Sequence, residues 1–240
     1  MAILSTSFPS ILFFALLGAA PSIIWLLYFL RNDRHPEPKR LIVRIFLLGM
    51  LVTIPVIFLE KEVHNFLSQL NIPPDLFYFL YFLFGVALVE ELAKYAMARI
   101  GVFSNRNLDE PVDVMIYMIT AALGFAAYEN ILLLMRIGPI HPVSSIIWIT
   151  EFRFIGATFL HALASGLFGY FLAIALFTTR RNSFRYFFIP FVGLVLATTL
   201  HGLFNYYIYR VEESQMLQLL LPTIILIGIS LFVALGFRKL

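Results

Sequence analysis

Two adjacent carboxylates and a lysine interrupt a long apolar stretch of the sequence, at Glu90, Glu91 and Lys94. A charge near the middle of a bilayer costs at least about 2.5–3.5 kcal/mol, so these three are expected to face a packed interior or a wet cavity. On a helix Lys94 follows Glu90 by four residues and Glu91 by three, and it can pair with either. The two glutamates point about 100° apart and are predicted to have different roles.

Further polar side chains interrupt later apolar stretches, at Glu129, Asn130, His161, His201 and Asn205. His201 and Asn205 are four residues apart and share a helix face, and so do His161 and Ser165. Small residues accompany these positions, and they let membrane helices approach closely. The polar faces are therefore predicted to be buried against one another.

The chemistry open to such a set is limited. A carboxylate in an apolar site can act as a general base or acid, histidine can share that work, and asparagine can donate to an oxyanion. Together they could activate water for peptide hydrolysis. Carboxylate and imidazole groups also suit zinc, and metal-assisted hydrolysis would use the same residues. A serine triad is disfavoured because no orienting acid lies near Ser165 in the sequence.

Composition places these residues in a membrane. The chain of 240 residues is 61% hydrophobic and 13% charged, whereas soluble domains carry about 25% charged residues. Cysteine is absent, which excludes disulfides, thiolate catalysis and cysteine-ligated metal. The basic residues lie in short loops, so the net charge of +3 does not indicate nucleic-acid binding. The first ten residues contain no Lys or Arg, which favours a retained first span over a cleaved signal.

The elements that must position the polar residues are predicted to be membrane helices. A span needs about 20 mostly apolar residues, and seven stretches meet this description, at Phe8–Leu30, Leu41–Leu59, Phe77–Ile100, Val112–Met135, Arg153–Phe177, Tyr186–Tyr207 and Leu217–Phe237. We predict an all-α polytopic protein with a single transmembrane domain over residues 1–240. Asp109 and Glu110 are expected to cap the fourth span, and the first loop, with Pro36 and Pro38, to be a solvated turn.

Loop charges predict the orientation. Of the 17 Lys and Arg residues, 12 fall in or beside alternate loops and the C-terminus, four fall on the other side, and Lys94 lies within a span. The positive-inside rule then places the N-terminus outside and the C-terminus in the cytoplasm. Helix rise puts His161 and His201 about 12 Å from the outer ends of their spans. The polar residues are thus predicted to lie in the outer half of the membrane.

Taken in order, the motifs resemble a known family. Glu90-Glu91-x-x-Lys94, Phe125-x-x-x-Glu129-Asn130, His161 and His201-x-x-x-Asn205 resemble the PrsW intramembrane proteases. That family is similar to the type II CAAX prenyl proteases and the Abi proteins. The segments Asp33 to Pro38 and Glu110-Pro111-Val112-Asp113 also look like PrsW sequences.

The resemblance implies a multi-pass protease of the bacterial plasma membrane, with its catalytic core within 77–207. Its expected partners are lipid and a membrane-anchored protein substrate of the anti-sigma-factor type, cut near the outer half of the membrane by glutamate-activated water. The implied catalytic residues are Glu90, Glu91, Glu129, His161, His201 and Asn205, with Lys94 and Asn130 in support. A divalent metal such as zinc would have as candidate ligands Glu90, Glu129, His161 and His201.

Several alternatives stay open from the sequence. The mechanism can be glutamic or metal-dependent, and either Glu90 or Glu91 can be the base. A non-catalytic membrane scaffold and a proton- or ion-coupled transporter are competing functions, although no inverted repeat or pair of broken helices supports a transporter.

Overall fold

A computed structural model describes residues 8–31, 35–102, 108–210 and 220–239 of the protein. Over these residues all regular structure is helical, which confirms the all-α prediction. In chain order the elements are α1 (Phe8–Leu30), α2 (Lys39–Ser68), α3 (Pro74–Leu80), the π-helix η2 (Tyr81–Ala87), α4 (Leu88–Val102), α5 (Pro111–Ile137), the 3₁₀ turn η3 (Gly138–Ile140), α6 (Val143–Ile155), α7 (Ala157–Thr178), α8 (Phe184–Arg210) and α9 (Leu220–Lys239).

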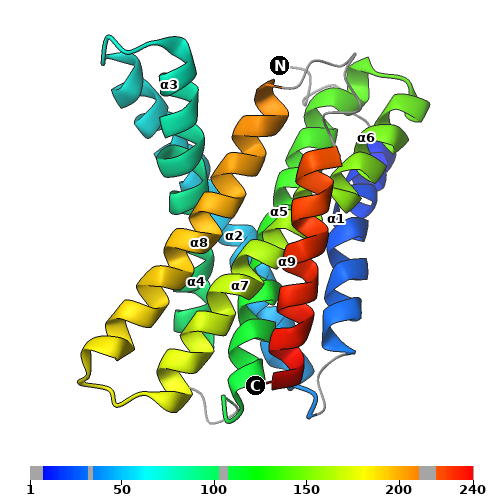
Figure 1. Cartoon of the computed structure of the whole chain (residues 1–240). Helices are drawn as coiled ribbons and strands as arrows, with labels where there is room; N and C mark the ends of the chain where they lie inside the picture. Colours follow the sequence, from blue (N-terminus) through cyan, green and yellow to red (C-terminus); the bar gives the residue numbers. More distant parts are fainter. Residues whose placement is uncertain (1–7, 32–34, 103–107, 211–219, 240) are drawn as a thin grey trace.

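Six helical stretches of the described chain are long and apolar enough to cross a membrane. They correspond to the first six predicted spans: α1, α2, the continuous run from α3 to α4, α5, the pair α6–α7, and α8. The seventh prediction corresponds to α9, whose apolar run Pro222–Arg238 is shorter than the others. Its expected start at Leu217 lies outside the described residues. Figure 1 shows α9 running alongside α5 and α7, and it packs against both.

Helix α5 lies at the centre of the bundle and packs against α1, α2, α4 and α7 (Figure 1). Close approach depends on its small residues: a Cβ on Gly124 would lie 2.0 Å from the backbone oxygen of Phe46 on α2. Similarly, a Cβ on Gly202 of α8 would lie 2.9 Å from Cα of Leu83 in η2. The prediction that small-residue faces are buried against one another is confirmed, and these contacts bring the polar positions of several helices together.

Helix α2 is longer than predicted. Its 30 residues span about 45 Å at 1.5 Å per residue, whereas the hydrocarbon core is about 30 Å thick. The prediction ended this span at Leu59 because the sequence turns polar there, but the helix continues to Ser68. Glu60 is therefore part of a helix that flanks the bundle rather than part of a loop.

The predicted fifth span is two helices. The backbone breaks at Gly156, with φ −91° and ψ −90°, between α6 and α7. Figure 1 shows α6 at the same end of the molecule as α3. Arg153 lies in the last turn of α6, before the break, rather than at the start of one continuous helix. The break therefore places Arg153 on a different helix from His161.

The π-helix η2 leads directly into the Glu-Glu motif. Such widened turns within a helix occur often at functional sites, and α8 packs on this one. Helix α4 follows at Leu88 and carries the motif on its first turn. Glu90 and Glu91 are only 2% and 0% exposed, which confirms that they avoid lipid.

The start of α5 is capped as predicted. Glu110 is the N-cap, and a capping box with Asp113 satisfies backbone N–H groups on both sides. The Tyr117 hydroxyl donates to Glu37 of the first-loop segment. Two segments that carry the family resemblance, Glu37-Pro38 and 110–113, are thereby joined by α5. Asp33, in the same first-loop motif, lies outside the described residues.

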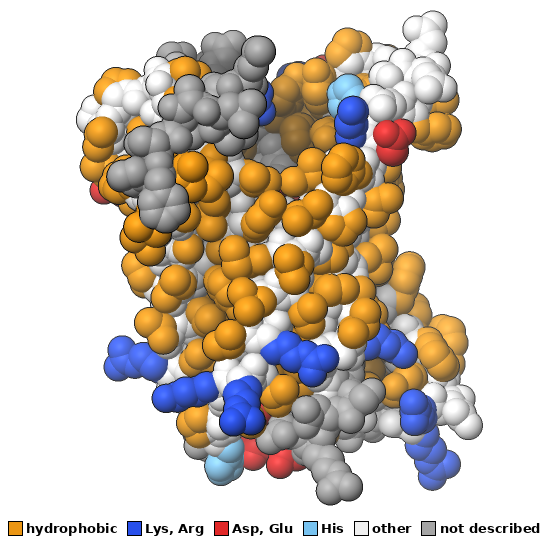
Figure 2. All heavy atoms as spheres, turned by 180° about the vertical axis from the view of Figure 1, so that it is seen from behind, with side chains coloured by type: hydrophobic (Ala, Val, Ile, Leu, Met, Phe, Trp, Pro, Cys, Tyr) orange, Lys and Arg blue, Asp and Glu red, His pale blue; other side chains and the backbone are white. Residues whose placement is uncertain are grey.

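The face drawn in Figure 2 is largely apolar, with most of its Lys and Arg side chains toward the end that holds the C-terminus in Figure 1. An apolar belt with basic residues at one end is the pattern of a multi-pass membrane protein. The assignment of that end to the cytoplasm stays a prediction from loop charges.

Candidate active site

The Glu-Glu motif forms a buried charge cluster with Lys94. Lys94 Nζ lies 3.0 Å from Glu90 Oε2 and 2.8 Å from Glu91 Oε1, so it pairs with both carboxylates. All three side chains are almost fully buried. Buried charges must be paired and hydrogen-bonded to be tolerated, and the predicted spacing along α4 provides this pairing within one helical turn.

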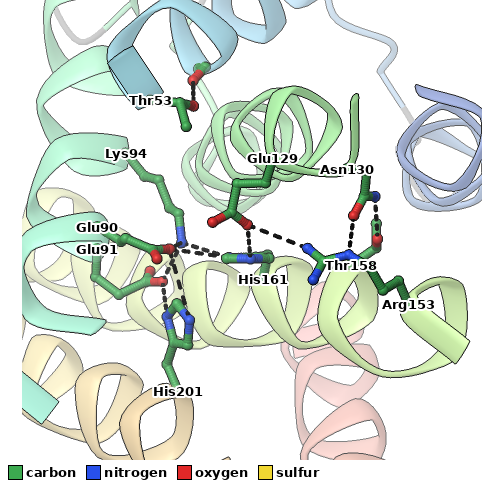
Figure 3. A network of polar contacts seen from close by, with 11 residues as sticks. Thr53, Glu90, Glu91, Lys94, Glu129, Asn130, Arg153, Thr158, His161 and His201 are labelled. Carbon is green, nitrogen blue, oxygen red and sulfur yellow. Dashed lines mark hydrogen bonds and ion pairs between the residues drawn. The ribbon is translucent and has the colours of Figure 1, made fainter. Parts of the chain in front are cut away.

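His201, from α8, lies beside the two glutamates (Figure 3). Its Nδ1 is 3.1 Å from Glu91 Oε1, and its Nε2 is 3.8 Å from Glu90 Oε2. The shorter distance assigns the ring N–H to Nδ1, which donates to Glu91. In this tautomer the lone pair of Nε2 faces Glu90.

His161, from α7, reaches the same cluster from the other side. Lys94 Nζ lies 2.8 Å from its Nδ1, and because an ammonium can only donate, Nδ1 accepts. The ring proton is then on Nε2, which lies 3.0 Å from Glu129 Oε2 of α5. The same Nδ1 is 3.5 Å from Glu90 Oε2. Both histidines therefore place the nitrogen without a proton near Glu90, and in His161 this nitrogen accepts from Lys94.

A second chain of polar contacts extends from Glu129 to the edge of the bundle. Arg153 of α6 lies 3.7 Å from Glu129 Oε2 and donates to the side-chain oxygen of Asn130. Asn130 in turn donates to Thr158 Oγ1 at 3.0 Å. The side chains of Glu129 and Arg153 are 28% and 25% exposed, in contrast to the buried cluster. These two side chains form the accessible edge of the site.

Glu91 is the most fully engaged carboxylate of the cluster. Besides Lys94 and His201, it accepts a hydrogen bond from Ser165 Oγ at 2.6 Å. Ser165 lies one turn from His161 on α7, but its hydroxyl donates to Glu91 and not to that histidine.

Three donors of the cluster fit a divalent metal by type and number. One atom each from Glu90, His161 and His201 lie within 4.8 Å of one another. Zinc in hydrolases takes three protein ligands and keeps one position open. The other nitrogen of each histidine is held by a carboxylate, Glu129 or Glu91, as is usual for metal-bound histidines. Glu129, predicted as a ligand, lies behind His161 and is not part of this group.

Lys94 affects whether these residues can hold a metal, because its Nζ contacts both Glu90 and His161. The ammonium supplies positive charge where a metal ion would also supply it. A metal held by Glu90 and His161 would compete with Lys94 Nζ for the same two atoms.

The comparison with known sequences agrees with this geometry. A family model described as "PrsW family intramembrane metalloprotease" matches residues 37–236. The chain belongs to the PrsW family. It is therefore an intramembrane peptidase, and the scaffold and transporter alternatives are not supported. The described membrane helices and the bacterial relatives indicate a multi-pass protein of a bacterial membrane.

Curated relatives named "Protease PrsW" match most of the chain. The protein of Oceanobacillus iheyensis is 30% identical over 195 residues, which cover 79% of this chain and 80% of that protein. The Geobacillus kaustophilus protein is 29% identical over 204 residues, covering 82% and 80%. The Bacillus subtilis protein is 28% identical over 193 residues, covering 79% of each. No solved structure matches the chain significantly.

Three residues of the PrsW-family site were not predicted from the sequence. Glu60 of α2 lies near enough to Glu90, Glu129 and Lys94 to interact with their charges. Glu60 lies outside the predicted core of 77–207. The second span was also expected to end one residue before it, at Leu59. Arg153 was counted as a loop charge, and Thr158 was not considered. A carboxylate that directly follows an apolar run was the available signal for Glu60.

Asn205 is not part of the polar network in this PrsW-family chain. It lies one turn beyond His201 on α8, is partly exposed, and makes no hydrogen bond with any described residue. Its role as an oxyanion donor stays a prediction. The other predicted site residues, from Glu90 to His201, do come together.

Proposed function

We propose that this PrsW-family peptidase hydrolyses a peptide bond of a membrane-anchored protein, with Glu90 as the general base. The observation that carries the proposal is how the carboxylates are engaged. Glu91 accepts from three donors, and Glu129 is bound by His161 and Arg153. Glu90 Oε2 instead accepts from Lys94 and lies 3.5 and 3.8 Å from the histidine nitrogens that carry no proton, Nδ1 of His161 and Nε2 of His201. This position supports Glu90 as the group that takes a proton from water.

In the proposed reaction, Glu90 accepts a proton from water as the water oxygen bonds to the substrate carbonyl carbon. The carbonyl π electrons move to its oxygen, and the nearby Lys94 ammonium offsets the negative charge. Collapse of this intermediate breaks the C–N bond, and the proton passes from Glu90 to the leaving amine. Asn205 is proposed as a donor to the oxyanion, since its amide is one turn from His201 and lacks a described partner.

A divalent metal, if bound, would be held by Glu90, His161 and His201, and Glu90 would then be a ligand rather than the general base. It would polarise the substrate carbonyl and make a bound water more acidic. Glu129 and Glu91 would then orient the two histidines through their ring N–H groups, as the distances of 3.0 and 3.1 Å support.

The proposed substrate is a single-span, membrane-anchored protein of the anti-sigma-factor type, as the family resemblance implies. Entry is proposed at the edge formed by Glu129 and Arg153, because the rest of the polar cluster is buried. Arg153 is on α6, at the end of the molecule that loop charges assign to the outside. Cleavage is therefore proposed in the outer half of the membrane.

The test uses purified protein in detergent with a single-span anti-sigma-type substrate, with and without a strong chelator. Glu90→Gln removes the base while it keeps the size of the side chain. Glu62→Gln is the matched control, because Glu62 is an exposed glutamate on α2. Metal content is measured on the same samples, and thermal unfolding shows that each variant is folded.

We expect Glu90→Gln to abolish cleavage and Glu62→Gln to cleave as wild type does. Loss of cleavage in the chelator together with one bound metal per chain would assign the metal-dependent form. Cleavage that persists in metal-free protein would assign the glutamic form. Cleavage by a folded Glu90→Gln protein would overturn the assignment of Glu90.

A further inference from the structure

A cavity separate from the active site lies between α4, α7 and the start of α8. Its volume is about 700 Å³. It adjoins the α7–α8 turn, at the end of the molecule where the basic side chains gather (Figures 1 and 2). The polar part of its wall includes Tyr95, Arg99, Arg181, Asn182 and Tyr186. No Asp or Glu contributes to this wall, so the cavity carries only positive formal charge.

Two guanidinium groups dominate the polar part of the cavity. Arg99 donates to the hydroxyl of Tyr95 at 2.6 Å, which leaves further N–H donors on the same group. In the described part of the chain, neither Arg99 nor Arg181 forms an ion pair with a carboxylate. Arg180 and Arg185 flank the same turn but do not line the cavity. The chemistry complementary to this arrangement is an anion with several acceptor oxygens, such as a phosphate.

The rest of the cavity is apolar. Leu172, Leu176, Phe187 and Pro190 line it, and Phe187 is 68% exposed on the outer surface of α8. A free phosphate ion has no apolar part that could contact this wall. A phospholipid matches both parts, because its headgroup is anionic and its acyl chains are apolar.

Basic residues beside an apolar wall also line two other hollows at this end of the molecule. One hollow pairs Arg31 and Arg238 with aromatic residues of α1 and α7. A shallower one pairs Lys39, Arg40 and Arg44 with the apolar face of α2. The cavity beside Arg99 and Arg181 is the largest of the three. Basic pockets between membrane helices are known binding sites for anionic lipid headgroups.

We propose that the cavity binds an anionic phospholipid, with its phosphate between Arg99 and Arg181 and an acyl chain along Leu176 and Phe187. The lipid would contact α4 at Tyr95, the residue that follows Lys94 of the charge cluster. It would thereby link α4 to α7 and α8 at the end opposite the accessible edge. Lipid binding here does not depend on the proposed peptidase chemistry.

The test titrates the full-length protein in neutral detergent with phosphatidylglycerol, phosphatidylcholine or inorganic phosphate, and counts bound lipid by native mass spectrometry. The informative variant is Arg99→Ala/Arg181→Ala. Its matched control is Arg180→Ala/Arg185→Ala, which removes the same charge beside the cavity but from outside its wall. Leu176→Trp keeps both arginines and fills the apolar part. Thermal unfolding identifies the folded variants.

We expect wild type to bind phosphatidylglycerol in preference to phosphatidylcholine, and Arg99→Ala/Arg181→Ala to bind it about 30-fold more weakly. The control pair is expected to bind as wild type does, and Leu176→Trp to lose most of the binding. Wild-type affinity in folded Arg99→Ala/Arg181→Ala or in Leu176→Trp would overturn the proposal. So would an equal loss in the control pair, or displacement of the lipid by inorganic phosphate at equal concentration.

Discussion

The imidazole rings of His161 and His201 lie 4.9 Å apart, centroid to centroid, and are nearly perpendicular, at 82°. Each ring is held from behind by a carboxylate, Glu129 for His161 and Glu91 for His201. These outer contacts fix the ring orientation, and they direct one nitrogen of each ring toward Glu90. The site thus has an inner layer, formed by Glu90 and the two histidines, and an outer layer, formed by Glu91 and Glu129. Substitutions in the outer layer can be tested separately from those in the inner layer.

The first prediction concerns Glu129, in the outer layer. Glu129→Gln keeps an acceptor for the Nε2–H of His161 but loses the charge that pairs with Arg153. We expect activity to fall about 10- to 100-fold, as for other residues that orient a catalytic or metal-bound histidine. Glu151→Gln, an exposed change on α6, is the control. Complete loss of activity in a folded Glu129→Gln protein would place Glu129 among the reacting groups.

The second prediction concerns Ser165, whose hydroxyl donates to Glu91. Ser165→Ala removes one of three donors to that carboxylate, and we expect activity to fall by no more than about tenfold. A serine nucleophile would instead lose on the order of a millionfold. Cleavage kinetics of the variant distinguish the two outcomes, and an inactive Ser165→Ala protein with normal thermal stability would contradict the assignment.

The main elements of the fold could be predicted because the bilayer sets the length of apolar runs and penalises charge within them. Glu90, Glu91 and Lys94 had to meet partners inside the protein, and the partners were other polar residues in neighbouring spans. The same reasoning could not find Glu60 or Arg153. Glu60 lies in the part of α2 that extends past the predicted end of the span, and Arg153 reaches the site because the chain breaks at Gly156.

The tautomers of the two histidines also required the structure. The sequence places His161 and His201 on two helices, but only distances show which nitrogen faces Glu90. The same distances show that Glu90 and Glu91 have different partners, and the choice of Glu90 as the base stays a proposal. Asn205 shows the opposite case: helical spacing put it on the face of His201, yet the network ends before it.

The third prediction concerns the charge balance around Lys94. Lys94→Met leaves two buried carboxylates without their common partner, and we expect a loss of about 3–5 kcal/mol in the free energy of unfolding. Glu91→Gln in the same protein removes one of those charges and should restore part of the loss. A double-mutant cycle on thermal unfolding in detergent measures this coupling. Strictly additive effects of the two substitutions would show that the ion pair does not stabilise the fold.

The fourth prediction concerns the contact between α2 and α5. A Cβ on Gly124 would lie 2.0 Å from the backbone oxygen of Phe46, which cannot move without shifting α2. Gly-to-Ala changes in a helix usually gain up to about 1 kcal/mol, but overpacking of this kind costs about 1–3 kcal/mol, so Gly124→Ala should destabilise the protein. Gly228→Ala on α9 is the control, because no atom lies within 4 Å of its Cβ position. If Gly124→Ala unfolds at the same temperature as Gly228→Ala, α2 and α5 do not pack this closely.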